Sequence, residues 1–178
     1  ACVTTPILNL FVVWLLKEAE RKKIRHLFFL ARDSYPLYLI AGQYCEKLQL
    51  KLKCSYFYCS RYSLRVPMYS ENTQEALDHV CRGGIDVTLR KILIRSGFEL
   101  QKAEELREYF EMDRELDAVI PYPELKNIKK ELSANKKYME MLRSVSTSKR
   151  DTVYRYFRQE GMLEEKIGIV DSGWTGTT

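Results

Sequence analysis

Two stretches of nearly continuous apolar residues stand out along the chain, IRHLFFLA at 24–31 and KIGIVDSG at 166–173. A third stretch, LKCSYFYCS at 52–60, is rich in aromatic residues and thiols. The short apolar runs at 24–31 and 166–173 are typical of strands that are buried on both faces of a sheet. We therefore predict three β-strands in these positions.

Two segments next to the predicted strands at 24–31 and 52–60 have the apolar periodicity of helices. Apolar residues recur at helical spacing from Pro6 to about Lys23 and again over 36–48. The second of these segments connects the strands at 24–31 and 52–60 by short joins. Two strands joined through a helix are expected to lie parallel, with a right-handed crossover.

The middle of the chain has a helical pattern throughout. We predict a single α/β domain over 1–178, with its sheet in about 1–60 and 161–178 and a helical insertion over about 61–160. The fold class is a three-layer parallel sheet of Rossmann-like or phosphoribosyltransferase-like type. Three strands make a thin sheet for this length, so we expect further strands after Thr178 and a longer parent protein. The helices predicted within the insertion are 72–82, 87–97, 100–111, 122–134 and 147–160.

Composition narrows the class of protein. With 46% hydrophobic and 30% charged residues, the composition is that of a globular protein. The net charge is +5, and over 99–166 the basic residues are interleaved with glutamates, as on an ordinary solvated surface. The sequence has no basic patch with interleaved aromatic residues, so we predict no nucleic-acid partner. The uncharged run at 3–16 is shorter than the roughly 18 residues of a membrane span.

Cysteine and histidine usage points to a cytoplasmic protein without a histidine metal site. The number of cysteines is odd, five, and no C-x-x-C spacing occurs, which favours reduced thiols. The two histidines, His26 and His79, lie far apart in the sequence.

Polar residues follow each predicted strand directly. In open α/β sheets ligands bind beyond the carboxyl ends of the strands, and here these ends lead into residues 32–34, 60–61 and 171–178. The three loops offer two carboxylates, two guanidinium groups and a run of glycines and hydroxyls. This set suits a phosphorylated small molecule, with or without Mg²⁺.

Each residue type has a physical role in such a site. Gly173 and Gly176 permit positive φ, so that successive N–H groups can form an anion nest. An arginine can bind phosphate oxygens bidentately. Asp33 and Asp171 are the candidate catalytic groups and the candidate Mg²⁺ ligands. The predicted phosphate-binding residues are Arg32, Ser34, Ser60, Arg61, Ser172, Gly173, Thr175, Gly176, Thr177 and Thr178.

Each of these residues also has a structural alternative to a role in ligand binding. An aspartate after a buried strand often caps the following turn or helix through its own side chain. Arg61 can instead form a bridge to Asp33 or Asp171 across the strand ends. A purely structural alternative for Trp174 is a lid over the core.

These loops match three known site patterns to different degrees. A haloacid dehalogenase site requires Asp-x-Asp after a strand, and neither ARDSY nor VDSGW has the second Asp. The Asp-x-Gly-x-Thr motif of actin-like kinases matches 171–175, but that motif normally opens a domain. The phosphate loop of type I phosphoribosyltransferases resembles IGIVDSGWTGTT, with a single acid, Asp171, in place of the usual pair.

One resemblance covers residues 6–178. The order of ARDSYPLYLIA, YCSRYSLRVP and IVDSGWTGTT resembles the region downstream of the catalytic domain in bacterial hydrolases of the haloacid dehalogenase (HAD) superfamily. These proteins are associated with glycosyltransferases and surface-polysaccharide synthesis. In them a FLARDG-like turn, an SR pair and a D-x-GW-x-GT loop recur, and Ser34 here stands in place of the glycine.

The resemblance implies an accessory domain, with the Asp-x-Asp of the hydrolase lying upstream of this chain. A first hypothesis is that the domain binds a nucleotide or sugar phosphate, and whether it is an enzyme stays open. The alternative is a non-catalytic scaffold that docks an adjacent HAD-like or glycosyltransferase domain. A phosphoribosyltransferase-like enzyme is a further alternative.

Overall fold

The computed structural model describes residues 4–163 and 166–172. The chain divides into two compact units. The first, here called the sheet unit, comprises Ala1–Arg61 and Arg155–Thr178, and the second, the helical unit, comprises Tyr62–Tyr154. Each unit has its own hydrophobic core, and the two are described separately.

The sheet unit contains a small parallel sheet. Its strands are β1 (His26–Leu30), β2 (Lys53–Phe57) and β3 (Ile167–Val170), in the order β2-β1-β3. Phe28 in the central strand lies opposite Ser55 on one side and Ile169 on the other. All three strands lie within the stretches predicted from the sequence, and the prediction of mixed helix and parallel strand is confirmed.

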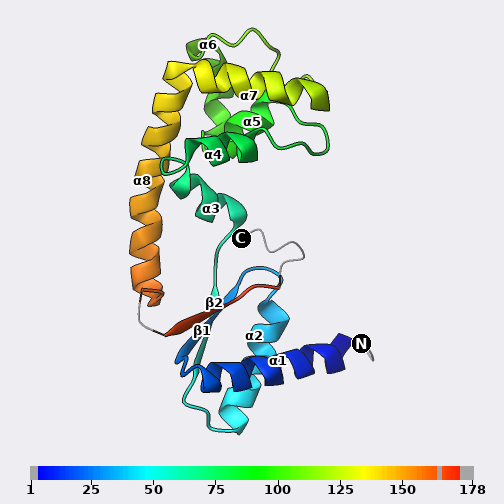
Figure 1. The fold of residues 1–178 in the computed structure, drawn as a ribbon, viewed down its shortest axis with the longest axis vertical. Coiled ribbons are helices and arrows are strands. Elements are labelled where there is room, and N and C mark those ends of the chain that lie inside the picture. The colour runs from blue at the N-terminus through cyan, green and yellow to red at the C-terminus, as the bar shows by residue number, and fades with distance from the viewer. Residues whose placement is uncertain (1–3, 164–165, 173–178) are drawn as a thin grey trace. The chain divides into compact units, whose positions relative to one another are not determined.

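Both faces of the central strand are covered. Leu27 and Phe29 pack with residues of α1 (Thr4–Arg21) and α2 (Tyr35–Lys47), which Figure 1 shows beside the strands. Phe28 and Leu30 belong to a second cluster, which includes Phe57 and, from the last turns of α8 (Lys136–Glu160), Tyr156 and Phe157. All five residues of β1 are buried, His26 included, as the nearly continuous apolar run predicts.

Gly168 shows why one position in β3 has no side chain. A Cβ at this residue would lie 2.6 Å from Leu27 Cδ2. Such a contact is far closer than two carbon atoms tolerate, so a larger residue here would force the buried Leu27 side chain to shift.

The helical unit is built from short helices around one core. Apolar side chains from all of its longer helices meet there, among them Leu77, Ile92, Ile128 and Leu142. Its elements are α3 (Arg61–Arg65, which begins in the sheet unit), α4 (Thr73–Val80), α5 (Leu89–Arg95), α6 (Ala103–Tyr109), α7 (Leu125–Ala134), α8, and 3-10 turns at Val66–Met68, Leu100–Lys102 and Tyr122–Glu124.

Helix α8 begins eleven residues earlier than the predicted start at 147. Asn135 separates it from α7, and the Asn135 side-chain oxygen accepts a hydrogen bond from the Tyr138 N–H at 3.0 Å. Tyr138, Met139 and Leu142 then give the first turns a buried face. The cap and this apolar face account for the early start.

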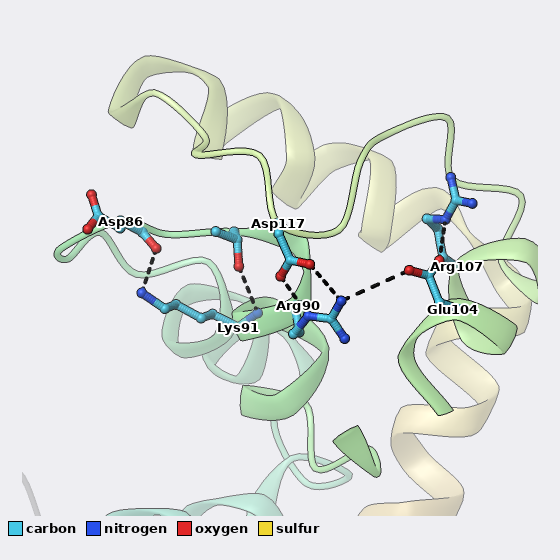
Figure 2. Close-up of polar contacts among 7 residues, drawn as sticks. Asp86, Arg90, Lys91, Glu104, Arg107 and Asp117 are labelled. Atoms are coloured by element: carbon cyan, nitrogen blue, oxygen red, sulfur yellow. Dashed lines mark hydrogen bonds and ion pairs between the residues drawn. The ribbon is translucent and has the colours of Figure 1, made fainter. Parts of the chain in front are cut away.

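An ion-pair cluster fixes a loop of the helical unit to its helices. Figure 2 shows Arg90 of α5 donating two hydrogen bonds of 2.6 Å to the carboxylate of Asp117. Glu104 of α6 lies 4.0 Å from Arg90 and accepts a hydrogen bond from Arg107 at 3.2 Å. Because these charges neutralise one another, we assign the cluster a structural role.

Candidate functional site at the carboxyl edge of the sheet

The carboxyl ends of the three strands lie at one edge of the sheet, here called the carboxyl edge, because the strands are parallel. Residues 32–34, 60–61 and 171–172 follow these ends. The Ala31 N–H donates to the Phe57 carbonyl at 2.9 Å, which extends the β1–β2 pairing past the end of β1. The structure thus brings together the described part of all three predicted loops.

Ser34 connects two of these loops from the inside. Its side chain is fully buried, and its hydroxyl donates to the Val170 carbonyl at 3.2 Å. The Ser34 and Ser172 hydroxyl oxygens also lie 3.2 Å apart. A hydroxyl has one hydrogen, so Ser34 accepts from Ser172 while it donates to Val170. The structure therefore gives Ser34, predicted to contact a ligand, a hydrogen-bonding role within the protein.

Arg32 and Asp33 face the solvent. Their side chains are 94% and 69% exposed, and the nearest ion-pair atoms, Arg32 Nε and Asp33 Oδ1, are 3.9 Å apart. Ser34, the residue at the start of α2, makes no side-chain capping bond. Among the residues that the structure describes, the Asp33 carboxylate caps no backbone N–H. It is accessible to a ligand or metal ion.

Exposed polar side chains also follow the two outer strands. Ser60 and Arg61 come after β2, Asp171 and Ser172 after β3, and all four are exposed. Together with Arg32 and Asp33 they place two guanidinium groups and two carboxylates at the carboxyl edge. Charges of both signs at one edge suit a phosphorylated ligand that binds with a metal ion.

Cys59 lies between these loops and was not predicted as a site residue. Burial raises the pKa of its thiol, and the negative charge of Asp171 raises this pKa further, while a hydrogen bond from the Ala31 backbone lowers it. The net direction is upward, so the thiol stays protonated near neutral pH. A protonated thiol is a poorer nucleophile than a thiolate.

Two exposed tyrosines flank the same edge. Tyr35 directly follows Ser34 and is 48% exposed, and Tyr58 directly follows β2 and is 74% exposed. Each makes an edge contact with Tyr56, at ring-centroid distances of 5.2 and 5.1 Å. The alternation of Tyr56 and Tyr58 along the strand was a signal in the sequence that both lie on one face. Such rings offer flat surfaces to the sugar or base of a ligand.

Part of the predicted site lies outside the described residues. Gly173, Trp174, Thr175, Gly176, Thr177 and Thr178 belong to this part, so the anion nest stays a prediction. Within 4–163 and 166–172 no group of three or more His, Cys, Asp and Glu side chains forms a metal cluster. Asp33 and Asp171 would provide the one or two carboxylates that Mg²⁺ usually takes from a protein.

Comparison with known proteins yields no match, either to a family model or to a curated protein. In the described part of the chain, no helix combines the length and apolar character that crossing a membrane requires.

Proposed function

We propose that the sheet unit is a Rossmann-like accessory domain of a HAD-type hydrolase and binds a phosphorylated small molecule at the carboxyl edge. The observation that carries the proposal is the exposure of Arg32, Asp33 and Arg61 at one edge of a parallel sheet. Parallel α/β sheets bind ligands at this edge because the loops after neighbouring strands converge there.

Each side chain has a distinct task in this proposal. Arg32 and Arg61 bind phosphate oxygens through charge-assisted hydrogen bonds. Asp33 and Asp171 hold a Mg²⁺ ion, which neutralises phosphate charge. Tyr35 and Tyr58 lie beside the ring of a nucleotide or sugar phosphate, while Ser34 holds the loops after β1 and β3 together.

Thermal unfolding with a ligand series tests the proposal. The series contains nucleotides, sugar phosphates, phosphoribosyl diphosphate and inorganic phosphate, each with and without Mg²⁺. A bound ligand stabilises the folded state by RT ln(1 + [L]/Kd), about 2.7 kcal/mol when [L] is 100 times Kd. We expect the unfolding temperature to rise with at least one organic phosphate, and more so with Mg²⁺.

A matched pair of arginine variants locates the site. Arg61→Ala is expected to abolish most of the ligand-induced shift, because it removes a phosphate contact. Arg21→Ala removes an exposed arginine at the end of α1, which belongs to neither the carboxyl edge nor its loops, and is expected to leave the shift unchanged. Equal shifts in both variants, or no shift with any ligand in the wild-type chain, would contradict the proposal.

A second candidate function is docking of a neighbouring hydrolase or glycosyltransferase domain. It is favoured by exposed apolar side chains at helical spacing on α1: Ile7, Leu10 and Trp14 are 59%, 71% and 55% exposed. Sedimentation of the chain mixed with its HAD-type neighbour tests it. Complex formation that Leu10→Asp abolishes, together with no ligand-induced shift, would favour the scaffold.

A further inference from the structure

A cavity of about 510 Å³ lies at the end of the sheet unit opposite the carboxyl edge. Its walls come from α1, the end of α2 and the residues just before β1 and β2. Small-molecule sites typically measure about 300–1,000 Å³, so the cavity has the size of a ligand site. None of its lining residues belongs to the candidate phosphate site.

Apolar side chains form the walls of this cavity. Leu16 lines it from α1, and Ile24 and Leu52 line it from the approaches to β1 and β2. Leu48 and Leu50, from the turn after α2, are 62% and 37% exposed beside it. Covering these exposed leucines with an apolar group would lower the free energy, because it removes apolar surface from water.

Cationic side chains border the cavity. Lys17, Lys23, Arg25 and Lys51 line it and are exposed, and Glu20 is the acidic residue among the lining residues. Within the described part of the chain, none of the four cations forms an ion pair. In the helical unit, by contrast, Lys102, Lys129 and Lys137 each form an ion pair with a carboxylate.

Helix ends explain only part of this charge. α1 ends at Arg21 beside the cavity, and the negative end of its dipole attracts the cations that directly follow it, including Lys23. Lys17 lies a turn earlier, and Arg25 and Lys51 precede strands. The excess of positive charge around an apolar cavity therefore indicates a complementary negative group on whatever fills it.

We propose that this cavity binds a small organic anion with an apolar body, such as a medium-chain carboxylate. The apolar chain covers Leu48, Leu50 and the inner wall, and the carboxylate lies among Lys17, Arg25 and Lys51. Concavity favours a small molecule over a membrane surface, because the apolar residues line a cavity between elements.

Calorimetric titration of the chain with decanoate, below its micelle concentration, tests the proposal. Decyltrimethylammonium provides the same chain with the opposite charge, and acetate provides the carboxylate without the chain. Saturable binding of decanoate, at least about tenfold tighter than that of either control compound, is expected; tenfold corresponds to about 1.4 kcal/mol. Equal binding of both decyl compounds, or no binding of decanoate, would overturn the proposal.

Two double variants with the same change in net charge test whether decanoate binds in the cavity. Lys17→Glu with Lys51→Glu reverses two lining cations and should weaken decanoate binding by at least about tenfold. Lys22→Glu with Lys47→Glu makes the same change in net charge at nearby exposed positions that do not line the cavity, and should leave affinity within about twofold. Circular dichroism verifies folding of both variants.

Equal effects of the two variants would overturn the assignment to the cavity. So would binding of the chain to phosphatidylglycerol vesicles without saturable binding of decanoate, since the cationic face would then recognise a membrane surface. The ligand series for the carboxyl edge is independent of these outcomes, because the two sites share no residue.

Discussion

The hydroxyl of Ser34 holds two loops of the candidate site together from a fully buried position. Ser34→Ala would leave the Val170 carbonyl without this donor. A buried polar group left without its partner costs about 1–3 kcal/mol, and we expect the free energy of unfolding to fall by that amount. Urea unfolding followed by circular dichroism measures the change.

Ser144→Ala is the matched control for this prediction. Ser144 is an exposed residue of α8, so the same substitution there should change stability by no more than about 0.5 kcal/mol. A loss at Ser34 no larger than the change at Ser144 would show that the Ser34–Val170 hydrogen bond contributes nothing to stability.

Prediction from the sequence reached its limit at single side chains. The positions of Arg32, Asp33 and Ser34 directly after a strand were enough to expect them at the carboxyl edge. They were not enough to show that Ser34 faces inward while its two neighbours face the solvent. This difference depends on the turn between β1 and α2 and on the hydrogen bond to β3, which lies far along the chain.

At the scale of elements, the Arg90–Asp117 pair connects α5 to the loop that precedes α7 (Figure 2). The hydrogen bond from Arg90 lowers the pKa of Asp117 below its ordinary value of 3.8. A lowered pKa in the folded state means that the pair stabilises the fold above the ordinary pKa. This contribution is lost as the pH falls from about 4 toward the lower folded-state value.

Asp117→Asn tests this pH dependence. The variant should lose stability at pH 7, where the carboxylate of the wild-type protein is charged. The difference in unfolding free energy between the two proteins should shrink as the pH falls below 3.8. Because the pair is exposed, added salt should weaken it as well. A difference that does not change between pH 7 and pH 3 would contradict the role of the charge.

Strands were easier to predict than helix boundaries. Each strand coincides with a short apolar or aromatic run in the sequence. Only the central strand β1 is buried along its whole length, whereas β2 and β3 are partly exposed. The start of α8 was missed because Lys136 and Lys137 make its first turn look solvated. The cap at Asn135 and the buried stripe of Tyr138, Met139 and Leu142 were both present in the sequence, but only the fold shows that α7 ends at Ala134, directly before the cap.

At the scale of the whole molecule, the two units differ in how the chain builds them. The helical unit is one continuous segment, Tyr62–Tyr154, whereas the sheet unit combines Ala1–Arg61 with Arg155–Thr178. The core of the helical unit is formed entirely by residues between Val66 and Leu142, with Val145 packed against it. Its contacts are therefore available without the sheet, while β3 has to pair with a strand from the other end of the chain.

This difference predicts that a fragment spanning residues 62–154 folds alone. It should show a helical circular dichroism spectrum and a cooperative thermal transition, because a continuous segment carries its whole apolar core. Leu132, which is fully buried there, provides the control: Leu132→Ala should lower the stability of the fragment by about 2–5 kcal/mol. A fragment without a cooperative transition, or one indifferent to Leu132→Ala, would mean that this core forms only together with the sheet unit.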